Sequence, residues 1–209
     1  MPVGALPAGG IYAITAASES EERLLRDAES CLANGVSMLQ YRDKSRDYHD
    51  RLKLASTLCR LCDRYGKPLI INDDLELALE SRAAGIHLGK EDMDALPIAK
   101  RASHEMLVGV SCYDSLQRAR DAIAAGADYV AFGSVFESST KRSANRCSLD
   151  LLHTARAEFS VPIVAIGGIT PENGREVLHA GAHFLAVISG IFGQSDIAVA
   201  VHRYASLFT

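Results

Sequence analysis

The chain has 209 residues, 48% of them hydrophobic, which is enough apolar material for one substantial core. Its formal net charge of −4 and its pI near 6.0 argue against a general nucleic-acid binder, because such proteins are usually basic. The sequence contains no run of 18 or more apolar residues, so we expect no membrane-spanning helix.

We expect one domain over residues 1–209, with residues 1–10 as an N-terminal extension, because no linker or low-complexity stretch divides the chain. Residues 1–10 lack the charged start and the length of a secretory signal. The five cysteines leave one unpaired in any full pairing, which fits the reducing cytoplasm. Cys59 and Cys62 have the spacing of a metal or redox pair. Because no second pair accompanies them, core packing is our main interpretation and a zinc or redox role the alternative.

Eight short apolar runs predict β-strands, and a polar or glycine-rich cluster follows seven of them. The runs are almost continuously aliphatic or β-branched, as is typical of parallel strands that helices cover. In chain order the predicted strands are Ile11–Thr15, Val36–Leu39, Leu69–Ile71, Ile86–Leu88, Leu107–Val110, Tyr129–Phe132, Ile163–Ile166 and Phe184–Ile188.

Segments with apolar residues at helical spacing separate the strands, and most of them end at a glycine. The helices to which the pattern gives bounds are Glu19–Asn34, Asp47–Tyr65, Leu75–Ala84, Asp114–Ala125 and Glu172–Ala180. This alternation allows a closed barrel or an open doubly wound sheet. An open sheet gathers its site at one switch point, whereas here nearly every strand has a polar end. We therefore predict a single (β/α)₈ TIM barrel of the α/β class.

The second strand is followed by Gln40, Arg42 and Lys44, which alternate along the chain. On an extended segment these three side chains would share one face. One amide and two cations on one face suit a polyanion such as pyrophosphate, and a solvated strand end is the alternative.

Carboxylates follow the third and fourth strands, where Asn72 and Asp73 end one and Asp92 follows the other. Two carboxylates beside a cationic phosphate pocket suit Mg²⁺, which prefers oxygen ligands and bridges to substrate phosphate. Asp74 is expected to cap the next helix, and a simple helix cap is also the alternative interpretation of the Asn-Asp-Asp run.

Hydroxyls and glycines follow the last three strands, in the segments Ser138–Lys141, Gly167-Gly168 and Ser189-Gly190. Backbone N–H groups after strands seven and eight form a common phosphate site of TIM barrels. We therefore expect two anion pockets across the barrel mouth, one for a diphosphate with Mg²⁺ and one for a monophosphate. Two phosphorylated ligands facing each other imply a transfer reaction that joins them.

In chain order these residues resemble the motifs of the thiamine-phosphate synthase family, from Ile11 to about Phe192. The matching motifs are Gln40-x-Arg42-x-Lys44, Asn72-Asp73, His87-Leu88-Gly89-x-x-Asp92, Gly109-Val110-Ser111, Thr140-Lys141 and Ala165-Ile166-Gly167-Gly168-Ile169. The resemblance implies a TIM-barrel transferase with Mg²⁺ as its cofactor. It would couple hydroxymethylpyrimidine diphosphate to thiazole phosphate, or to its carboxylate form, and release pyrophosphate.

The resemblance also assigns roles to individual residues. The implied ligands of the pyrimidine diphosphate are Gln40, Arg42, Lys44, Asn72, Ser111 and Lys141. Arg42, Lys44 and Lys141 would be catalytic, because they would neutralise the leaving group. Asp73 and Asp92 would hold Mg²⁺. The implied thiazole-phosphate pocket comprises Ser138, Ser139, Thr140, Gly168, Ile188 and Ser189. The family usually has Thr-Pro-Thr-Lys-Pro where this chain has residues 138–142, so thiazole affinity is the property most affected.

Two other functions stay open from the sequence. In thiazole-isomerising paralogues a histidine follows the Phe-Gly of the sixth strand, whereas Ser134 stands there in this chain. A non-catalytic sensor of phosphorylated ligands could use the same barrel. We expect small-molecule substrates, no nucleic acid and no membrane partner, and the sequence leaves a homodimer open. No general base can be named, and His87 is expected to fill the barrel or orient its rim.

Overall fold

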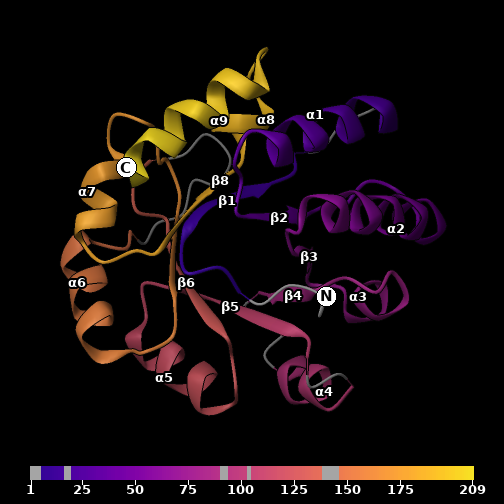
Figure 1. Ribbon diagram of the computed structural model, residues 1–209. Helices are drawn as coiled ribbons and strands as arrows, with labels where there is room; N and C mark the ends of the chain where they lie inside the picture. Colours follow the sequence, from indigo (N-terminus) through magenta and orange to yellow (C-terminus); the bar gives the residue numbers. More distant parts are fainter. Residues whose placement is uncertain (1–5, 17–19, 90–93, 103–104, 138–145) are drawn as a thin grey trace.

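Eight parallel strands pair in sequence order, and the eighth pairs with the first, so that they close into a barrel. In the computed structural model, which describes residues 6–16, 20–89, 94–102, 105–137 and 146–209, helices surround this barrel (Figure 1). The strands are β1 Gly10–Ile14, β2 Met38–Tyr41, β3 Leu69–Asn72, β4 Gly85–Leu88, β5 Leu107–Tyr113, β6 Tyr129–Gly133, β7 Ile163–Ile166 and β8 Phe184–Val187. The predicted TIM barrel is confirmed.

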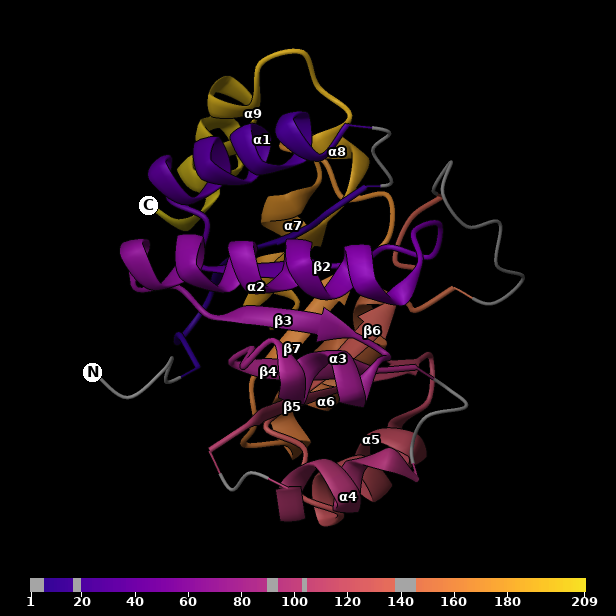
Figure 2. The same ribbon diagram turned by 90° about the vertical axis from the view of Figure 1, so that its right-hand side faces the viewer.

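The helices lie on the outer face of the barrel, as Figure 2 shows for the layer that covers β2 and β3. They are α1 Glu21–Ala33, α2 Tyr48–Tyr65, α3 Leu75–Glu80, α4 Ala95–Ala102, α5 Leu116–Ala124, α6 Leu149–Glu158, α7 Gly174–His179, α8 Ser189–Phe192 and α9 Ile197–Ala205, followed by the short 3₁₀ helix η1 Ser206–Phe208. The sequence pattern gave no bounds for α4, α6, α8 and α9.

Two apolar cores result from the alternation of side chains along each strand. One fills the barrel and includes Tyr12, Met38, Tyr129 and Phe184, each at most 1% exposed. The larger core packs the outward faces of the strands against the helices. Helix starts are fixed locally, since Asp47 and Asp74 accept hydrogen bonds from the N–H groups of Asp50 and Leu77. The predicted cap role of Asp74 is thus confirmed.

Four strands, β2, β3, β5 and β6, extend further at their carboxyl ends than the sequence pattern predicted. Gln40 lies inside β2 and Ser111 inside β5, whereas both were expected to follow their strands. Helix α3 is shorter than expected and ends at Glu80, because the Ser81 hydroxyl donates to the Leu77 carbonyl and Arg82 takes a left-handed conformation with φ 57°. Gln40 and Ser111 are therefore positioned by barrel strands and not by loops.

All five cysteines are free and buried. Cys59 and Cys62 lie on the buried face of α2, so the packing interpretation is confirmed for both. Burial raises the pKa of the Cys59 thiol to about 12, which keeps it protonated and unreactive at neutral pH. Over the residues described, the structure contains no helix both long and apolar enough to cross a membrane.

Candidate active site

A cavity of about 470 Å³ opens among the carboxyl ends of the strands. Residues from both predicted ligand sets line it, namely Gln40, Arg42, Asn72, Ser111, Gly168, Ile188 and Ser189. The described residues of the two predicted ligand sets therefore line one continuous cavity. Active sites of TIM barrels lie at this end of the strands.

Arg42 brings a cation to the cavity just after β2. Its backbone is fixed by Thr15, whose hydroxyl accepts a hydrogen bond from the Arg42 N–H at 2.9 Å and donates to the Arg42 carbonyl at 3.3 Å. Within the described ranges, no carboxylate forms an ion pair with the Arg42 guanidinium. A guanidinium in this setting is suited to bidentate binding of a phosphate group.

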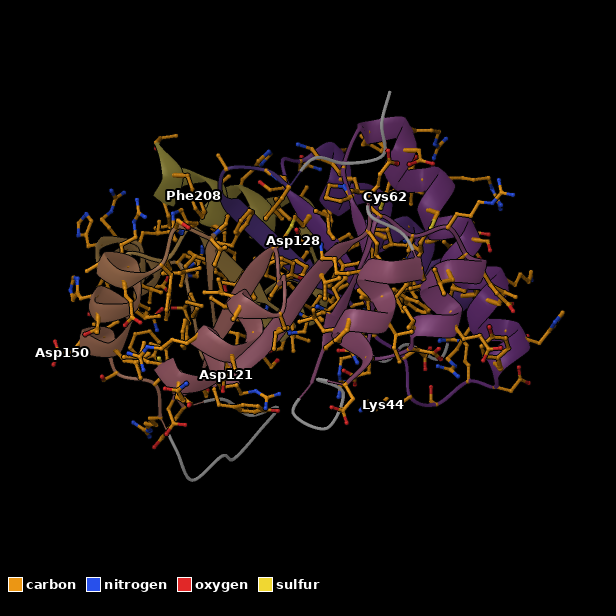
Figure 3. The ribbon with its side chains drawn as sticks, turned by 90° about the horizontal axis from the view of Figure 1, so that it is seen from below. Lys44, Cys62, Asp121, Asp128, Asp150 and Phe208 are labelled. Atoms are coloured by element: carbon orange, nitrogen blue, oxygen red, sulfur yellow. The ribbon has the colours of Figure 1, made fainter. Side chains whose placement is uncertain are left out.

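Lys44 lies at the same end of the barrel, but its side chain is 64% exposed and does not line the cavity. The expected alternation fails here because β2 ends at Tyr41, and the chain then turns toward α2. The ammonium nitrogen Nζ instead lies 3.4 Å from Oδ2 of Asp73. Figure 3 shows Lys44 at the opposite end of the barrel from Cys62 and Asp128. Lys44 can thus reach a ligand shared with Asp73.

Asp43 organises the turn that carries both cations. One carboxylate oxygen, Oδ1, accepts hydrogen bonds from the Ser45 N–H at 2.8 Å and the Ser45 hydroxyl at 2.7 Å, and Oδ2 pairs with Arg46. Burial alone would raise the pKa of Asp43, but these hydrogen bonds from Ser45 and Arg46 lower it to about 2. The carboxylate is therefore ionised throughout the physiological range.

Asp73 stands at the end of β3 in a left-handed conformation with φ 63°, which is rare for a residue other than glycine. Its N–H donates to the His87 carbonyl at 2.9 Å, and its Oδ2 accepts from the Asn72 amide at 2.7 Å. Strained conformations of this kind cluster at functional sites. The backbone of Asp73 is thus held by β4 while its carboxylate faces Lys44.

The Asp73 carboxylate is compatible with the expected Mg²⁺. It would be an oxygen ligand, which Mg²⁺ prefers, and such sites commonly use one or two carboxylates plus waters. Asp92, the second predicted ligand, lies outside the described residues. Among the residues that are described, no three His, Cys, Asp or Glu side chains form a metal cluster.

His87 is buried inside the barrel, as its predicted packing role requires. Its Nε2 lies 2.9 Å from the Ser111 hydroxyl, and its Nδ1 lies 3.2 Å from the Tyr129 hydroxyl. Burial lowers the pKa of His87 to about 4, against the opposing charge of Asp73. The imidazole is therefore neutral at pH 7. It connects the cavity-lining Ser111 to tyrosines of the barrel interior.

Glycines shape the other side of the cavity, after β7. Gly167 and Gly168 have φ values of 105° and 62°. A Cβ on Gly168 would lie 2.3 Å from the Glu137 carbonyl oxygen, so a larger residue cannot fit. Ser189 and Gly190 begin α8, and the first N–H groups of a helix have no partner inside that helix. This side of the cavity thus offers backbone donors.

Four predicted ligands, Ser138, Ser139, Thr140 and Lys141, lie outside the described residues. The structure adds cavity-lining residues that the sequence interpretation did not name, and these include Tyr12, Tyr113, Glu137 and Tyr204. Tyr12 could have been predicted, because it lies two residues before Ile14 on a barrel strand, so that both side chains point to the same face. Tyr204 comes from α9, to which the sequence pattern gave no bounds.

The family described as thiamine monophosphate synthase has a sequence profile that matches residues 11–191. The thiamine-phosphate synthase of Thiobacillus denitrificans is 46% identical over 200 residues, covering 96% of this chain and 95% of that protein. The enzyme of the same name from Nitrosococcus oceani is also 46% identical over 200 residues, covering 95% of this chain and 92% of that protein.

Among solved structures, the chain is similar to thiamine phosphate pyrophosphorylase from Pyrococcus furiosus, with a TM-score of 0.85 and 31% identity. That similarity covers 95% of this chain and 94% of the other. The sequence matches and the fold match therefore point to the same family, and each covers nearly the whole chain. The chain belongs to the thiamine monophosphate synthase family.

Proposed function

We propose that the protein is a thiamine-phosphate synthase that joins hydroxymethylpyrimidine diphosphate to thiazole phosphate, or to its carboxylate form with loss of CO₂, and releases pyrophosphate. The observation that carries this proposal is a continuous cavity lined by described residues of both ligand sets, Arg42 from one set and Gly168 from the other. Relatives that bear this name cover nearly the whole chain. A cavity open to two phosphorylated molecules suits a condensation between them.

The diphosphate is proposed to bind Arg42 and Lys44, with Lys141 as a further ligand. Arg42 is a cation without a carboxylate partner among the described residues, and Lys44 is near Asp73. Asp73 and Asp92 would hold Mg²⁺. When bound, the ion would neutralise charge on the pyrophosphate. The monophosphate of the thiazole would take the backbone N–H groups near Gly168, Ile188 and Ser189, with Ser138, Ser139 and Thr140 as further ligands.

The proposed reaction is a dissociative substitution. The C–O bond between the pyrimidine methylene and the diphosphate breaks, and both electrons leave with pyrophosphate. The ring amino group stabilises the resulting cation, and the lone pair of the thiazole nitrogen then forms the new C–N bond. Arg42, Lys44 and Lys141 would stabilise the developing negative charge on pyrophosphate. The cavity would hold the pyrimidine methylene carbon and the thiazole nitrogen in line.

No proton is lost from the thiazole nitrogen in this scheme, so the site needs no general base. His87 is neutral, buried and bonded on both ring nitrogens, which fits a positioning role better than proton transfer. Thiazole isomerisation is less well supported. Ser134 stands where a histidine would be needed, and its hydroxyl donates to the Phe136 carbonyl at 2.7 Å.

Pyrophosphate release provides the test. We expect the purified protein to release pyrophosphate and form thiamine phosphate when Mg²⁺ and both substrates are present. Removing the metal with a chelator, or omitting thiazole phosphate, should abolish product formation. Binding of the diphosphate without its consumption would instead identify a sensor, and formation of a rearranged thiazole without pyrophosphate would identify an isomerase.

Location and assembly are further parts of the proposal. We place the protein in the cytoplasm, and its five free, buried cysteines support this. A homodimer is compatible with the sequence, and sedimentation equilibrium of the purified protein would test it. Whether Mn²⁺ replaces Mg²⁺ follows from the same pyrophosphate assay.

A further inference from the structure

Five polar side chains inside the barrel form one continuous line of hydrogen bonds, which we call the buried network. The Gln40 amide donates to the Tyr12 hydroxyl at 2.7 Å, and the Tyr12 and Tyr129 hydroxyls lie 2.9 Å apart. The Tyr129 hydroxyl lies 3.2 Å from Nδ1 of His87, whose Nε2 lies 2.9 Å from the Ser111 hydroxyl. The network therefore runs from β2 to β5 through β1, β6 and β4.

A glycine makes this path sterically feasible. Gly109 on β5 is the register partner of both His87 on β4 and Tyr129 on β6. A Cβ at position 109 would lie 1.9 Å from the Tyr129 ring, so the phenol occupies the space of the missing side chain. The His87 and Tyr129 rings stack there with centroids 5.7 Å apart. The network is thus built into the packing of the barrel.

The protons of the network must be ordered together. Each tyrosine hydroxyl has one proton, and a neutral imidazole has one donor and one acceptor nitrogen. If the Gln40 amide donates to Tyr12, then Tyr12 donates to Tyr129 and Tyr129 donates to Nδ1 of His87. Nε2 of His87 then donates to Ser111, whose own proton is left for a ligand. The opposite order reverses every bond.

The two orders present different groups to the cavity, because both ends of the network line it. In the first order Gln40 presents its carbonyl oxygen and Ser111 presents a proton. In the second order Gln40 presents its amide N–H groups and Ser111 can only accept. Neither the Gln40 side-chain amide nor the Ser111 hydroxyl has another hydrogen-bond partner among the residues that the structure describes. The state of one end therefore fixes the state of the other.

We propose that Tyr12, Tyr129 and His87 are positioning residues that couple recognition of the anion to recognition of the ring. A diphosphate oxygen that accepts the Ser111 proton selects the first order. Gln40 then presents a carbonyl oxygen, which accepts from the amino group of an aminopyrimidine and repels the oxygen of a pyrimidinone. This inference rests on the proposed function, since it names how the same site chooses its pyrimidine.

Coupling of this kind is reciprocal and has a measurable size. Coupling between two binding sites typically changes affinity about 5- to 150-fold. We therefore expect the preference for the aminopyrimidine over the 4-oxopyrimidine to be larger by that factor for the diphosphates than for the free alcohols. The alcohols lack the anion, so they do not bias the order at Ser111.

The experiment measures dissociation constants of four probes by calorimetry with Mg²⁺ present and thiazole phosphate absent. The probes are the amino- and oxopyrimidine diphosphates and the two corresponding alcohols. Tyr129→Phe keeps the ring over Gly109 but cuts the network, and Tyr12→Phe cuts it beside Gln40. In each variant we expect the preference for the aminopyrimidine over the oxopyrimidine to be the same for the diphosphates as for the alcohols. Combining both changes should cause no further loss, because one break already uncouples the ends.

Tyr65→Phe is the control. It also removes a tyrosine hydroxyl, one on α2 that donates to Glu29 at 3.4 Å, does not line the cavity and takes no part in the network. The extra preference for the diphosphates should survive in this variant. The tautomer of His87, read from ¹⁵N chemical shifts of the wild-type protein with bound diphosphate, should carry its proton on Nε2.

Equal preferences in the wild-type protein, full coupling in both tyrosine variants, or a proton on Nδ1 of His87 would each overturn the inference. The proposed function is judged separately, by pyrophosphate release from the wild type. If the wild type releases pyrophosphate but shows no coupling, only the role of the network is refuted. If it releases no pyrophosphate with both substrates and Mg²⁺ present, the proposed function is refuted.

Discussion

Arg42 and Lys44 differ at the scale of single residues, although the sequence suggested equal roles for them. Arg42 lines the cavity and is anchored by Thr15, whereas Lys44 is largely exposed and lies near Asp73. A guanidinium can bind a phosphate through two parallel hydrogen bonds, which an ammonium cannot do. Arg42 is therefore the stronger candidate for charge stabilisation during departure of pyrophosphate.

Replacing Arg42 with alanine should lower kcat/KM for pyrophosphate release by about 10²–10³. Arg42→Lys should recover only part of the loss, because the charge returns without the planar fork. Arg60→Ala is the control, since Arg60 is an exposed arginine of α2 that bonds to Thr57. Steady-state kinetics of the three variants would check this, and near-normal turnover of Arg42→Ala would refute the assignment.

Asp43 acts on the stability of the turn between β2 and α2. Because its carboxylate is held by Ser45 and Arg46, we expect Asp43→Asn to lower the free energy of unfolding by about 1–3 kcal/mol at pH 7. The pKa of Asp43 is lowered to about 2 in the folded protein from an ordinary value of 3.8. The stabilisation is therefore complete above the ordinary value and is lost as the pH falls through about 2.

Urea unfolding of wild type and Asp43→Asn at several pH values would measure this. The difference between the two proteins should be constant from pH 7 down to about 4 and should shrink between about 4 and 2. A difference that stays the same over that range would contradict the role given to the ionised carboxylate.

At the scale of the elements, a polar contact ties α4 to the two strands that follow it. Asp128, just before β6, accepts hydrogen bonds from the Val108 N–H at 2.6 Å and from Lys100 at 2.5 Å. Lys100 also donates to the Met106 carbonyl at 3.1 Å. This contact lies at the amino end of the barrel, far from Lys44 in Figure 3. It stabilises the barrel without touching the cavity.

We expect Asp128→Ala to lower the free energy of unfolding by about 1–3 kcal/mol, because the partly buried Val108 N–H and Lys100 lose their acceptor. Turnover should stay close to that of the wild type. Asp121→Ala is the control, since Asp121 is an exposed residue of α5 and its loss should change stability by less than about 0.5 kcal/mol. A large loss of turnover with unchanged stability in Asp128→Ala would contradict the purely stabilising role of this contact.

The closed barrel and its interior core belong to the scale of the whole molecule. Phe184 of β8 is 0% exposed and packs inside the barrel beside residues of other strands. Because β8 pairs with β1, the last strand completes the ring that the first begins. Stability of the interior therefore depends on all eight strands together.

Phe184→Ala should lower the free energy of unfolding by about 3–5 kcal/mol, through lost apolar burial and the cavity left behind. Phe208→Ala is the matched control, because Phe208 of η1 is 38% exposed and its truncation should cost much less. Denaturant unfolding of both variants would check the difference. Similar losses for the two would mean that Phe184 is not part of a tightly packed interior.

The sequence predicted those features that depend on near neighbours. Eight apolar runs gave the strands, and Asp47 and Asp74 were recognisable as helix starts because a cap acts on the N–H three residues later. The ends of β2 and β5 were missed, since polar Gln40 and Ser111 look like loop residues. Their side chains are accommodated inside the barrel by hydrogen bonds from distant strands.

By itself, the sequence determined the strand–helix alternation, the barrel class and the identity of the motif residues, because these depend on local spacing and composition. Only the tertiary structure decided that Lys44 turns toward Asp73 and that Tyr12 meets Tyr129, 117 positions away in the chain. Contacts of that separation follow from strand register and closure of the ring, and no local pattern encodes them. The same physical reason explains why the buried network became visible only in three dimensions.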